Sequence, residues 1–241
     1  RGMIDPNQLE SLIHVGNRSF PNTKLVALEN THNTAGGTIL TPTDMATIAE
    51  VTIAHDVSLH LDGARVFNAA VALEIPVSEL TKHVQSVSFC LSKGLGAPVG
   101  SLLCASQETI DDARRWRKIL GSAMRQAGVI AAAGVVALET MVDRLSTDHA
   151  NAKRLAVGLE QIPEIHIKPD ALPTNLIFCT VEVSNEYVLI DKLDQRGIKV
   201  LPRGKGQWRM VTHNDVTAPD IDYALDVITK VFHDFARSER R

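Results

Sequence analysis

Ser86-Val87-Ser88-Phe89-Cys90-Leu91-Ser92-Lys93-Gly94-Leu95-Gly96 is the stretch that decides the fold of this 241-residue chain. Its first six residues form an apolar run typical of a buried strand, and Lys93 follows where that strand ends. The neighbouring glycines leave room beside the lysine. Burial disfavours the charged form of a lysine, and a neutral lysine is a nucleophile for carbonyl groups. The characteristic product of that nucleophile is a Schiff base.

A second strand, expected over Val57–Leu61, runs directly into Asp62-Gly63-Ala64-Arg65. Taken singly, Ser-Lys-Gly and Asp-Gly are each more typical of a solvated turn or a helix cap. Together, at the ends of two apolar strands, they provide what pyridoxal phosphate requires: Asp62 for the ring nitrogen and Lys93 for the aldehyde. The residue chemistry therefore favours a cofactor site, with ordinary turns as the alternative.

Strands and helices alternate through the first half of the chain, and Thr41-Pro42-Thr43-Asp44 has the composition of a helix start. We expect strands over 24–30, 57–61, near Phe89 and over 102–104, with a helix over 41–56. This order is typical of an α/β fold with a mostly parallel sheet and helices on both faces. Ligands of such sheets bind beyond the carboxyl ends of the strands, where Asp62 and Lys93 both fall.

The second half changes character after Pro163. Residues 107–159 have a helical pattern, and the segment rich in small residues from Gly128 to Leu138 predicts a tightly packed internal helix. We expect strands over 164–167, 175–181, 197–201 and 208–212, and helices over 185–196 and 219–235. The sequence thus predicts a large domain over residues 1–144 and a smaller α+β domain over residues 145–241.

Composition excludes several classes of function. The net charge of -3 predicts no general affinity for nucleic acid or for an anionic membrane. No apolar run approaches the ~18 residues that a membrane helix requires. The three cysteines lie in apolar runs without metal-ligand spacing, so we expect them to be reduced and buried, as in a cytoplasmic protein. A metal site built on His55, His60 and Asp62 lacks the spacing of a ligand trio.

Three longer motifs identify a family: Leu28–Asn33 (LENTHN), Leu61–Ala69 (LDGARVFNA) and Cys90–Ser101 (CLSKGLGAPVGS). With these motifs the chain closely resembles the L-threonine aldolases, a family that includes the low-specificity and L-allo-threonine enzymes. Arg115–Lys118 and Trp208–His213 extend the match, as does Met124-Arg125-Gln126. The resemblance implies a fold-type-I, aspartate-aminotransferase-like enzyme that uses pyridoxal 5'-phosphate.

The resemblance also implies roles for single residues. Lys93 matches the lysine that binds the cofactor, and Asp62 matches the partner of its ring nitrogen. Arg65 and Arg209 match arginines near the substrate carboxylate, which a guanidinium binds in a fixed fork. A helix-surface ion pair is the alternative for Arg65, and a solvated charge at a strand edge is the alternative for Arg209.

Three further residues have weaker matches. Lys118 matches a basic residue near the substrate, and Arg125 matches one near the cofactor; surface salt bridges explain both nearly as well. His32 follows the strand that carries Glu29, and we expect it to take the hydroxyl proton of the substrate directly or through water. A loop or capping histidine is the alternative interpretation.

The implied reaction splits L-threonine or L-allo-threonine into glycine and acetaldehyde. β-Elimination, decarboxylation or transamination of a small amino acid remain alternatives, because each needs Asp62 and Lys93. Many family members have a histidine where this chain has Ser19, which leaves the choice between threonine and allo-threonine open.

The resemblance further implies a homotetramer built as a dimer of dimers. About a hundred residues precede this chain's start in family members, among them the loop that holds the cofactor phosphate. The chain is therefore expected to be incomplete at its N-terminus, or to need a separate N-terminal fragment of the same protein. A non-catalytic fragment is the remaining alternative.

Overall fold

The structure of the protein is a computed structural model, and it describes residues 2–16, 18–167 and 172–239. The chain divides into two compact units, Arg1–Leu145 and Ser146–Arg241. Each unit has a sheet and a hydrophobic core of its own, and each is described by itself.

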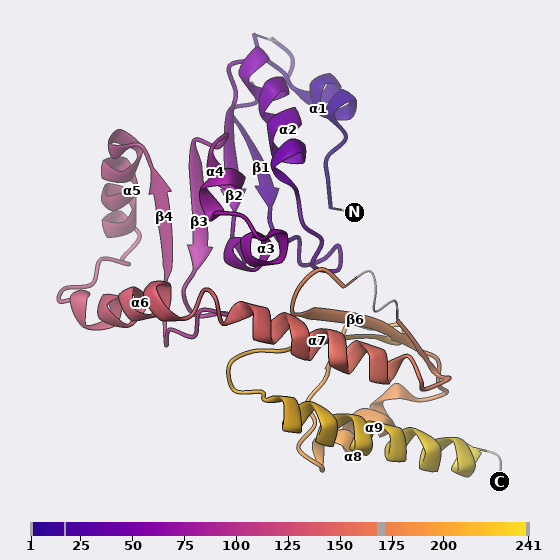
Figure 1. The fold of residues 1–241 in the computed structure, drawn as a ribbon. Coiled ribbons are helices and arrows are strands. Elements are labelled where there is room, and N and C mark those ends of the chain that lie inside the picture. Colours follow the sequence, from indigo (N-terminus) through magenta and orange to yellow (C-terminus); the bar gives the residue numbers. More distant parts are fainter. Residues whose placement is uncertain (1, 17, 168–171, 240–241) are drawn as a thin grey trace. The chain divides into compact units, whose positions relative to one another are not determined.

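The sheet of the first unit has the strand order β1-β2-β3-β4 (Figure 1). Strands β1 (Leu25–Glu29), β2 (Ser58–Asp62) and β3 (Ser86–Cys90) are parallel, whereas β4 (Ser101–Ala105) runs antiparallel to β3 at the edge. The predicted α/β class with a mostly parallel sheet is therefore confirmed. Because β1, β2 and β3 are parallel neighbours, their carboxyl ends meet at one edge of the sheet.

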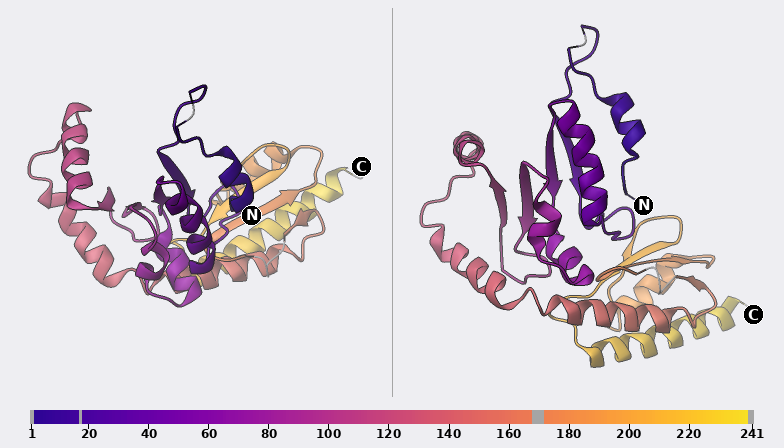
Figure 2. Two further views of the ribbon diagram at one scale, coloured as in Figure 1. Left: turned by 90° about the horizontal axis from the view of Figure 1, so that it is seen from above. Right: turned by 45° about the horizontal axis from the view of Figure 1, so that its top comes forward.

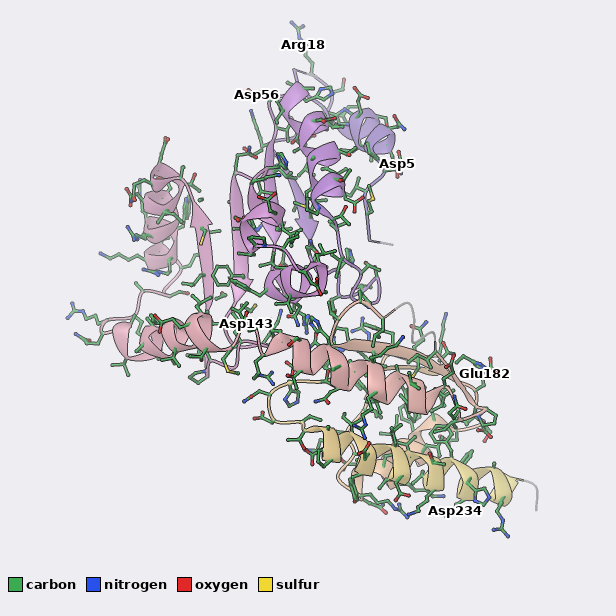
Figure 3. All side chains as sticks on the ribbon, viewed as in Figure 1. Asp5, Arg18, Asp56, Asp143, Glu182 and Asp234 are labelled. Atoms are coloured by element: carbon green, nitrogen blue, oxygen red, sulfur yellow. The ribbon has the colours of Figure 1, made fainter. Side chains whose placement is uncertain are left out.

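The described residues of the first unit form six helices, and three of them begin at a side-chain cap, namely Asp5, Thr41 and Ser106. The Asp5 carboxylate accepts the N–H of Gln8 at the start of α1 (Figure 3). Thr41 and Asp44 form a reciprocal capping box at the start of α2, which satisfies two backbone N–H groups that the helix itself leaves unpaired. The helices are α1 (Pro6–Leu12), α2 (Pro42–Ala54), α3 (Val66–Leu73), α4 (Val77–Thr81), α5 (Gln107–Ile119) and α6 (Gly128–Thr140).

The core of this unit lies against one face of the sheet. Val26 and Leu28 of β1 are in register with Leu59 and Leu61 of β2, and all four are buried. Alternate residues of a strand point to opposite faces, so these four share one face, which belongs to the same core as α2, α3 and α4. Leu25 on the opposite face is more than half exposed.

The segment from β4 to α6 is far more exposed than its composition suggests. Helix α5 has no buried residue, and its side chains project on all sides (Figure 3). Helix α6 buries only Gly134 and Ala137, so the prediction of an internal helix over 128–138 is wrong. The prediction of buried cysteines is wrong for Cys104, which is exposed because β4 is an edge strand with little cover on either face.

Gly134 itself is a close-packing position, as its composition predicts. A Cβ atom there would lie 2.7 Å from Cδ1 of Leu91, which is closer than real Cβ contacts allow. The small residues of α6 thus allow close contact with the segment that carries Lys93 along one narrow side of the helix. The valines on its other sides are exposed.

In its described residues, the second unit combines three helices with an antiparallel sheet of strand order β5-β6-β8-β7. Helices α7 and α9 run side by side (Figure 2), and Arg154 on α7 is ion-paired with Asp222 on α9 at 2.6 Å. The elements are α7 (Leu145–Leu159), β5 (Ile165–His166), β6 (Leu176–Val181), α8 (Glu186–Asp194), β7 (Leu201–Pro202), β8 (Gln207–Val211) and α9 (Ala218–Glu239).

One predicted strand of this unit is misplaced. The expected strand over 197–201 is a loop, and β7 begins only at Leu201. Gly197 has a φ of +76° and its N–H donates to the carbonyl of Asp194, so it ends α8 instead of starting a strand. The apolar residues Ile198 and Val200 pack against the core of this unit from the loop.

No helix in the described ranges is both long enough and apolar enough to cross a membrane.

Candidate active site

Asp62 is the last residue of β2, the strand between β1 and β3. Its backbone carbonyl accepts the N–H of Asn30, which fixes the end of β2 against the end of β1. Its Oδ1 accepts the N–H of Ala64 at 3.0 Å, so the carboxylate also closes the turn that follows the strand. Both interpretations of Asp62 from the sequence are therefore compatible, because a turn residue can still present its second oxygen to a ligand.

Gly63 ties this turn to the neighbouring strand. Its N–H donates to the carbonyl of Ser88 on β3 at 2.7 Å. A Cβ atom at this position would lie 3.0 Å from that same carbonyl oxygen, so a larger residue would push the two strands apart. The glycine thus sets the close spacing between Asp62 and the strand that leads to Lys93.

Lys93 lies in a compact turn after β3. The N–H of Gly96 donates to the carbonyl of Lys93, and the N–H of Ala97 donates to the carbonyl of Leu91, both within 3.0 Å. Gly94 approaches Leu145 so closely that a Cβ atom would lie 2.7 Å from its Cδ2. The backbone that carries Lys93 is therefore held from both sides.

The Lys93 side chain is exposed, which contradicts the expectation that its amine is desolvated. The reason is local: the apolar run that predicts a buried strand ends at Leu91, and Lys93 lies on the outside of the turn beyond it. Within the described part of the chain, the Lys93 amine has no recorded hydrogen bond or ion pair, so it is available to a ligand.

Asn30 and Thr31 directly follow β1, and the sequence predicts no role for either of them. The Asn30 side chain is fully buried; its Nδ2 donates to the carbonyl of Leu40, and its Oδ1 accepts the N–H of Leu40. Thr31 is 2% exposed, and its hydroxyl has no hydrogen-bond partner among the described atoms. The signal that could have identified them is the placement of short polar side chains directly after a buried strand.

Four of the predicted site residues belong to segments at the carboxyl edge of the parallel strands. His32 is three residues beyond β1, Asp62 ends β2, and Lys93 is three residues beyond β3. Arg65 is half-buried and stands at the N-terminal end of α3, directly after the turn that Asp62 closes. The topology therefore brings a carboxylate, an amine, an imidazole and a guanidinium to one edge of one sheet.

The other three predicted residues do not belong to the segments that directly follow β1, β2 and β3. Lys118 is exposed in the last turn of α5, and Arg125 is exposed in the turn before α6. Arg209 belongs to the second unit, on β8 opposite Phe178, with its side chain partly buried. Their roles toward substrate and cofactor stay predictions.

His60 has a structural partner. Its Nδ1 lies 2.8 Å from the Ser86 hydroxyl, which links β2 to β3. His55 lies beside α1 instead, with its Nε2 3.7 Å from a carboxylate oxygen of Glu10. Across residues 2–16, 18–167 and 172–239, no three histidine, cysteine or acidic side chains cluster as metal ligands would.

Comparison with protein families gives a match that covers the first unit and part of the second. The family described as beta-eliminating lyase matches residues 1–182, which include every residue of the first unit. The chain belongs to the beta-eliminating lyase family. Asp62 and Lys93 of the candidate site lie inside the matched residues, and Arg209 lies outside them.

Relatives that are similar over most of this chain include low-specificity L-threonine aldolases. The chain is 41% identical over 229 residues to low-specificity L-threonine aldolase 1 of Arabidopsis thaliana, covering 93% of this chain and 64% of that protein. It is 42% identical over 198 residues to the low-specificity L-threonine aldolase of Escherichia coli K12, covering 82% of this chain and 57% of that protein. The chain thus spans a little under two thirds of the length of these relatives.

Solved structures support the fold. The threonine aldolase of Leishmania major superposes with a TM-score of 0.79 at 20% identity, covering 96% of this chain and 68% of that one. The serine palmitoyltransferase of Sphingomonas wittichii superposes with a TM-score of 0.74 at 18% identity, covering 96% of this chain and 59% of that one. At these identities the likeness shows the fold alone, and the predicted fold-type-I architecture is confirmed.

Proposed function

We propose that this protein is a pyridoxal phosphate-dependent aldolase that cleaves L-threonine or L-allo-threonine to glycine and acetaldehyde. The observation that carries the proposal is the pairing of Asp62 with Lys93 at adjacent strand ends, in a chain about 40% identical to low-specificity L-threonine aldolases. Because the chain spans only 64% of the first of those relatives, the activity is proposed for it by extension.

The donor set fits the cofactor. Asp62 keeps one carboxylate oxygen outside its own turn, and a carboxylate is the partner that a protonated pyridine nitrogen needs. Lys93 offers an exposed amine on a rigid turn, and this amine would hold the aldehyde carbon of the cofactor. The buried Thr31 hydroxyl is a further polar group at the same edge that has no partner within the described chain.

When bound, pyridoxal phosphate supplies an electron-withdrawing ring that allows a bond to the substrate Cα to break. Asp62 holds the proton on the ring nitrogen by its negative charge. Arg65 and Arg209 bind the substrate carboxylate and so orient the Cα–Cβ bond, since a guanidinium fixes the plane of a carboxylate. Lys118 and Arg125 are exposed on α5 and before α6, and they would add positive charge near the substrate and the cofactor from across a subunit interface.

A second reaction is favoured by one observation: the family that matches the chain is described as beta-eliminating lyase. β-Elimination would use the same Asp62 and Lys93, and decarboxylation or transamination would do so as well. Product analysis after incubation with L-threonine separates them. Glycine with acetaldehyde supports the aldolase, and 2-oxobutanoate supports β-elimination.

We further propose that the protein works as a homo-oligomer in the cytoplasm, with a tetramer of two dimers as the expected form. Support comes from the segment between residues 99 and 136, which exposes far more apolar surface than a monomer normally does. The exposed side chains are Val99, Leu102, Leu103, Trp116, Ile119, Leu120, Met124, Val129, Val135 and Val136. Three free cysteines suit a reducing compartment.

The same surface supports an alternative, in which the chain is a non-catalytic fragment that needs a separate N-terminal segment. Native mass spectrometry of the purified chain distinguishes the two. Tetramers of the 241-residue chain that retain cofactor support the homo-oligomer. A chain that binds cofactor only together with a second, different polypeptide supports the fragment.

The primary test is Lys93→Ala, matched with Lys82→Ala as an exposed lysine of the same unit that is ion-paired with Glu79. We expect Lys93→Ala to lower threonine cleavage by about 10³-fold or more, because it removes the amine that holds the cofactor. Lys82→Ala should cleave threonine like the unmodified chain. Borohydride reduction followed by peptide mass spectrometry should find the cofactor on the Lys93 peptide. Undiminished glycine release by Lys93→Ala would refute the proposal.

A further inference from the structure

The loop after β1 holds the backbone of His32 from both sides. The His32 N–H donates to the carbonyl of Thr38 at 2.9 Å, and the His32 carbonyl accepts the N–H of Gly37 at 2.9 Å. These two bonds make an isolated antiparallel bridge, so the loop returns on itself around the histidine. A surface histidine in an ordinary loop needs no such anchoring.

The imidazole ring is also fixed, and by a bond that specifies its protonation. The backbone N–H of Ala35 donates to Nδ1 of His32 at 3.2 Å. A ring nitrogen that accepts a hydrogen bond must carry a lone pair, so the neutral ring has its hydrogen on Nε2. The hydrogen bond from Ala35 to Nδ1 thus determines that Nε2 carries the hydrogen of the neutral ring.

Glu29 is the acidic group nearest to Nδ1, and it does not alter this assignment. Its Oε2 lies 3.6 Å from Nδ1, beyond hydrogen-bonding distance, and its Oε1 accepts the N–H of Asn33 at 3.1 Å. A proton on Nδ1 would face the N–H of Ala35 and break the bond that closes the loop. The Glu29 carboxylate therefore stabilises the loop through the N–H of Asn33 and accepts no hydrogen bond from Nδ1.

Gly2 lies close against the ring. A Cβ atom on Gly2 would lie 2.5 Å from Cγ of His32 and 2.7 Å from its Cδ2, so only a glycine fits there. The side chain of His32 nevertheless remains 28% exposed, and its Nε2 has no recorded partner in the part of the chain that the structure describes. Nε2–H is thus the polar group that this histidine offers to a ligand.

We propose that His32 acts as a hydrogen-bond donor through Nε2–H to an oxygen of the bound amino acid, and not as the base that takes its hydroxyl proton. A nitrogen that already carries a hydrogen cannot accept another, and Nδ1 is occupied by Ala35. The identity of the ligand rests on the proposed function, whereas the state of the ring does not. The acceptor is a hydroxyl or carboxylate oxygen of the substrate.

The state of the ring is tested by nitrogen-15 NMR of the full 241-residue chain with labelled histidine, assigned by the loss of signals in His32→Gln. We expect long-range proton–nitrogen couplings at pH 8 to show the hydrogen of His32 on Nε2. A hydrogen on Nδ1 would overturn the proposal. This measurement needs neither substrate nor activity, so its result is independent of the proposed function.

The role at the site is tested by comparing His32→Gln with His32→Asn. A glutamine amide reaches the position of Nε2 and can donate there, whereas an asparagine amide reaches only the position of Nδ1. A donor role predicts threonine cleavage by His32→Gln within about 10-fold of the unmodified chain and a loss of about 10²-fold in His32→Asn. A base role predicts equal losses of about 10²-fold or more, because neither amide accepts a proton.

His166→Gln and His166→Asn serve as controls, since the His166 side chain is exposed on the second unit and lies 3.1 Å from a carboxylate oxygen of Glu182. Both should cleave threonine like the unmodified chain. Glycine binding identifies the acceptor, because glycine has the carboxylate but no hydroxyl: weaker glycine binding by His32→Asn points to the carboxylate, and unchanged binding points to the hydroxyl. If the unmodified chain releases no glycine from threonine, the proposed function and this donor role fail together, while the NMR result stands.

Discussion

At the residue scale, Asp62 closes the turn after β2 and is proposed to pair with the cofactor, and an amide substitution separates these two roles. In Asp62→Asn the Oδ1 atom can still accept the N–H of Ala64, so the turn after β2 should survive. The negative charge that is proposed to pair with the cofactor nitrogen is lost. We expect threonine cleavage to fall by about 10²-fold to 10⁴-fold, while the free energy of unfolding changes by less than about 0.5 kcal/mol.

Asp56→Asn is the matched control, because Asp56 is an exposed aspartate of the same unit whose φ of 55° an asparagine tolerates well. Initial rates of acetaldehyde release and urea denaturation measure the two effects. Wild-type rates in Asp62→Asn would show that the charge is not needed. A large loss of stability in that variant would instead show that the turn depends on the charge.

Helix α2 allows a prediction at the scale of an element. The Thr41 hydroxyl makes two hydrogen bonds at the start of this helix: it accepts the N–H of Asp44 at 3.2 Å, as one arm of the capping box, and it donates to the Asp44 carboxylate at 2.7 Å. Thr41→Ala removes both bonds and should lower the free energy of unfolding by about 1 kcal/mol. The helix supplies Met45 and Ile48 to the core of the first unit, so the loss should spread through that unit.

Thr47→Ala is the comparison within the same helix, because the Thr47 hydroxyl is exposed and only donates to the carbonyl of Thr43. Alanine is the better helix former, so this variant should be neutral or slightly stabilising. Urea denaturation followed by circular dichroism measures both variants. Equal stability of Thr41→Ala and Thr47→Ala would mean that the capping box contributes little.

At the scale of the whole molecule, the two units have separate hydrophobic cores, and two cysteines report on them individually. Cys104 is exposed on β4 of the first unit, whereas Cys179 is buried in the core of the second. Burial raises the pKa of the Cys179 thiol to about 12, and the thiolate is the reactive form. Cys104 should therefore react with a thiol reagent in the native protein, and Cys179 only when the second unit opens.

The raised pKa also has a consequence for stability. The folded state favours the protonated thiol, so the contribution of Cys179 is complete below its ordinary pKa of 9.0 and is lost as the pH rises toward 12. Peptide mass spectrometry after labelling at pH 8, over a series of urea concentrations, measures the accessibility of both thiols. Rapid labelling of Cys179 in the absence of urea would contradict a closed core in the second unit.

The order of strands and helices in both units could be predicted from the sequence, as could the placement of Asp62 and Lys93 at one edge of a sheet. Those features depend on local signals: apolar runs, a threonine cap before Pro42, and polar residues where a strand stops. The roles assigned to Arg65, Lys118, Arg125 and Arg209 and the domain boundary stay predictions.

Local sequence patterns by themselves determined most of the helices and strands of this protein and the placement of Asp62 and Lys93 where two neighbouring strands end. Only the tertiary structure decided which apolar surfaces are covered: α6 and β4 are apolar yet exposed, β3 is apolar yet only partly buried, and Lys93 beyond it faces solvent. It also decided the state of His32, through the Ala35 N–H that a returning loop brings to Nδ1. The physical reason is that periodicity is a property of neighbours along the chain, whereas burial and hydrogen-bond partners are set by residues that the fold brings together.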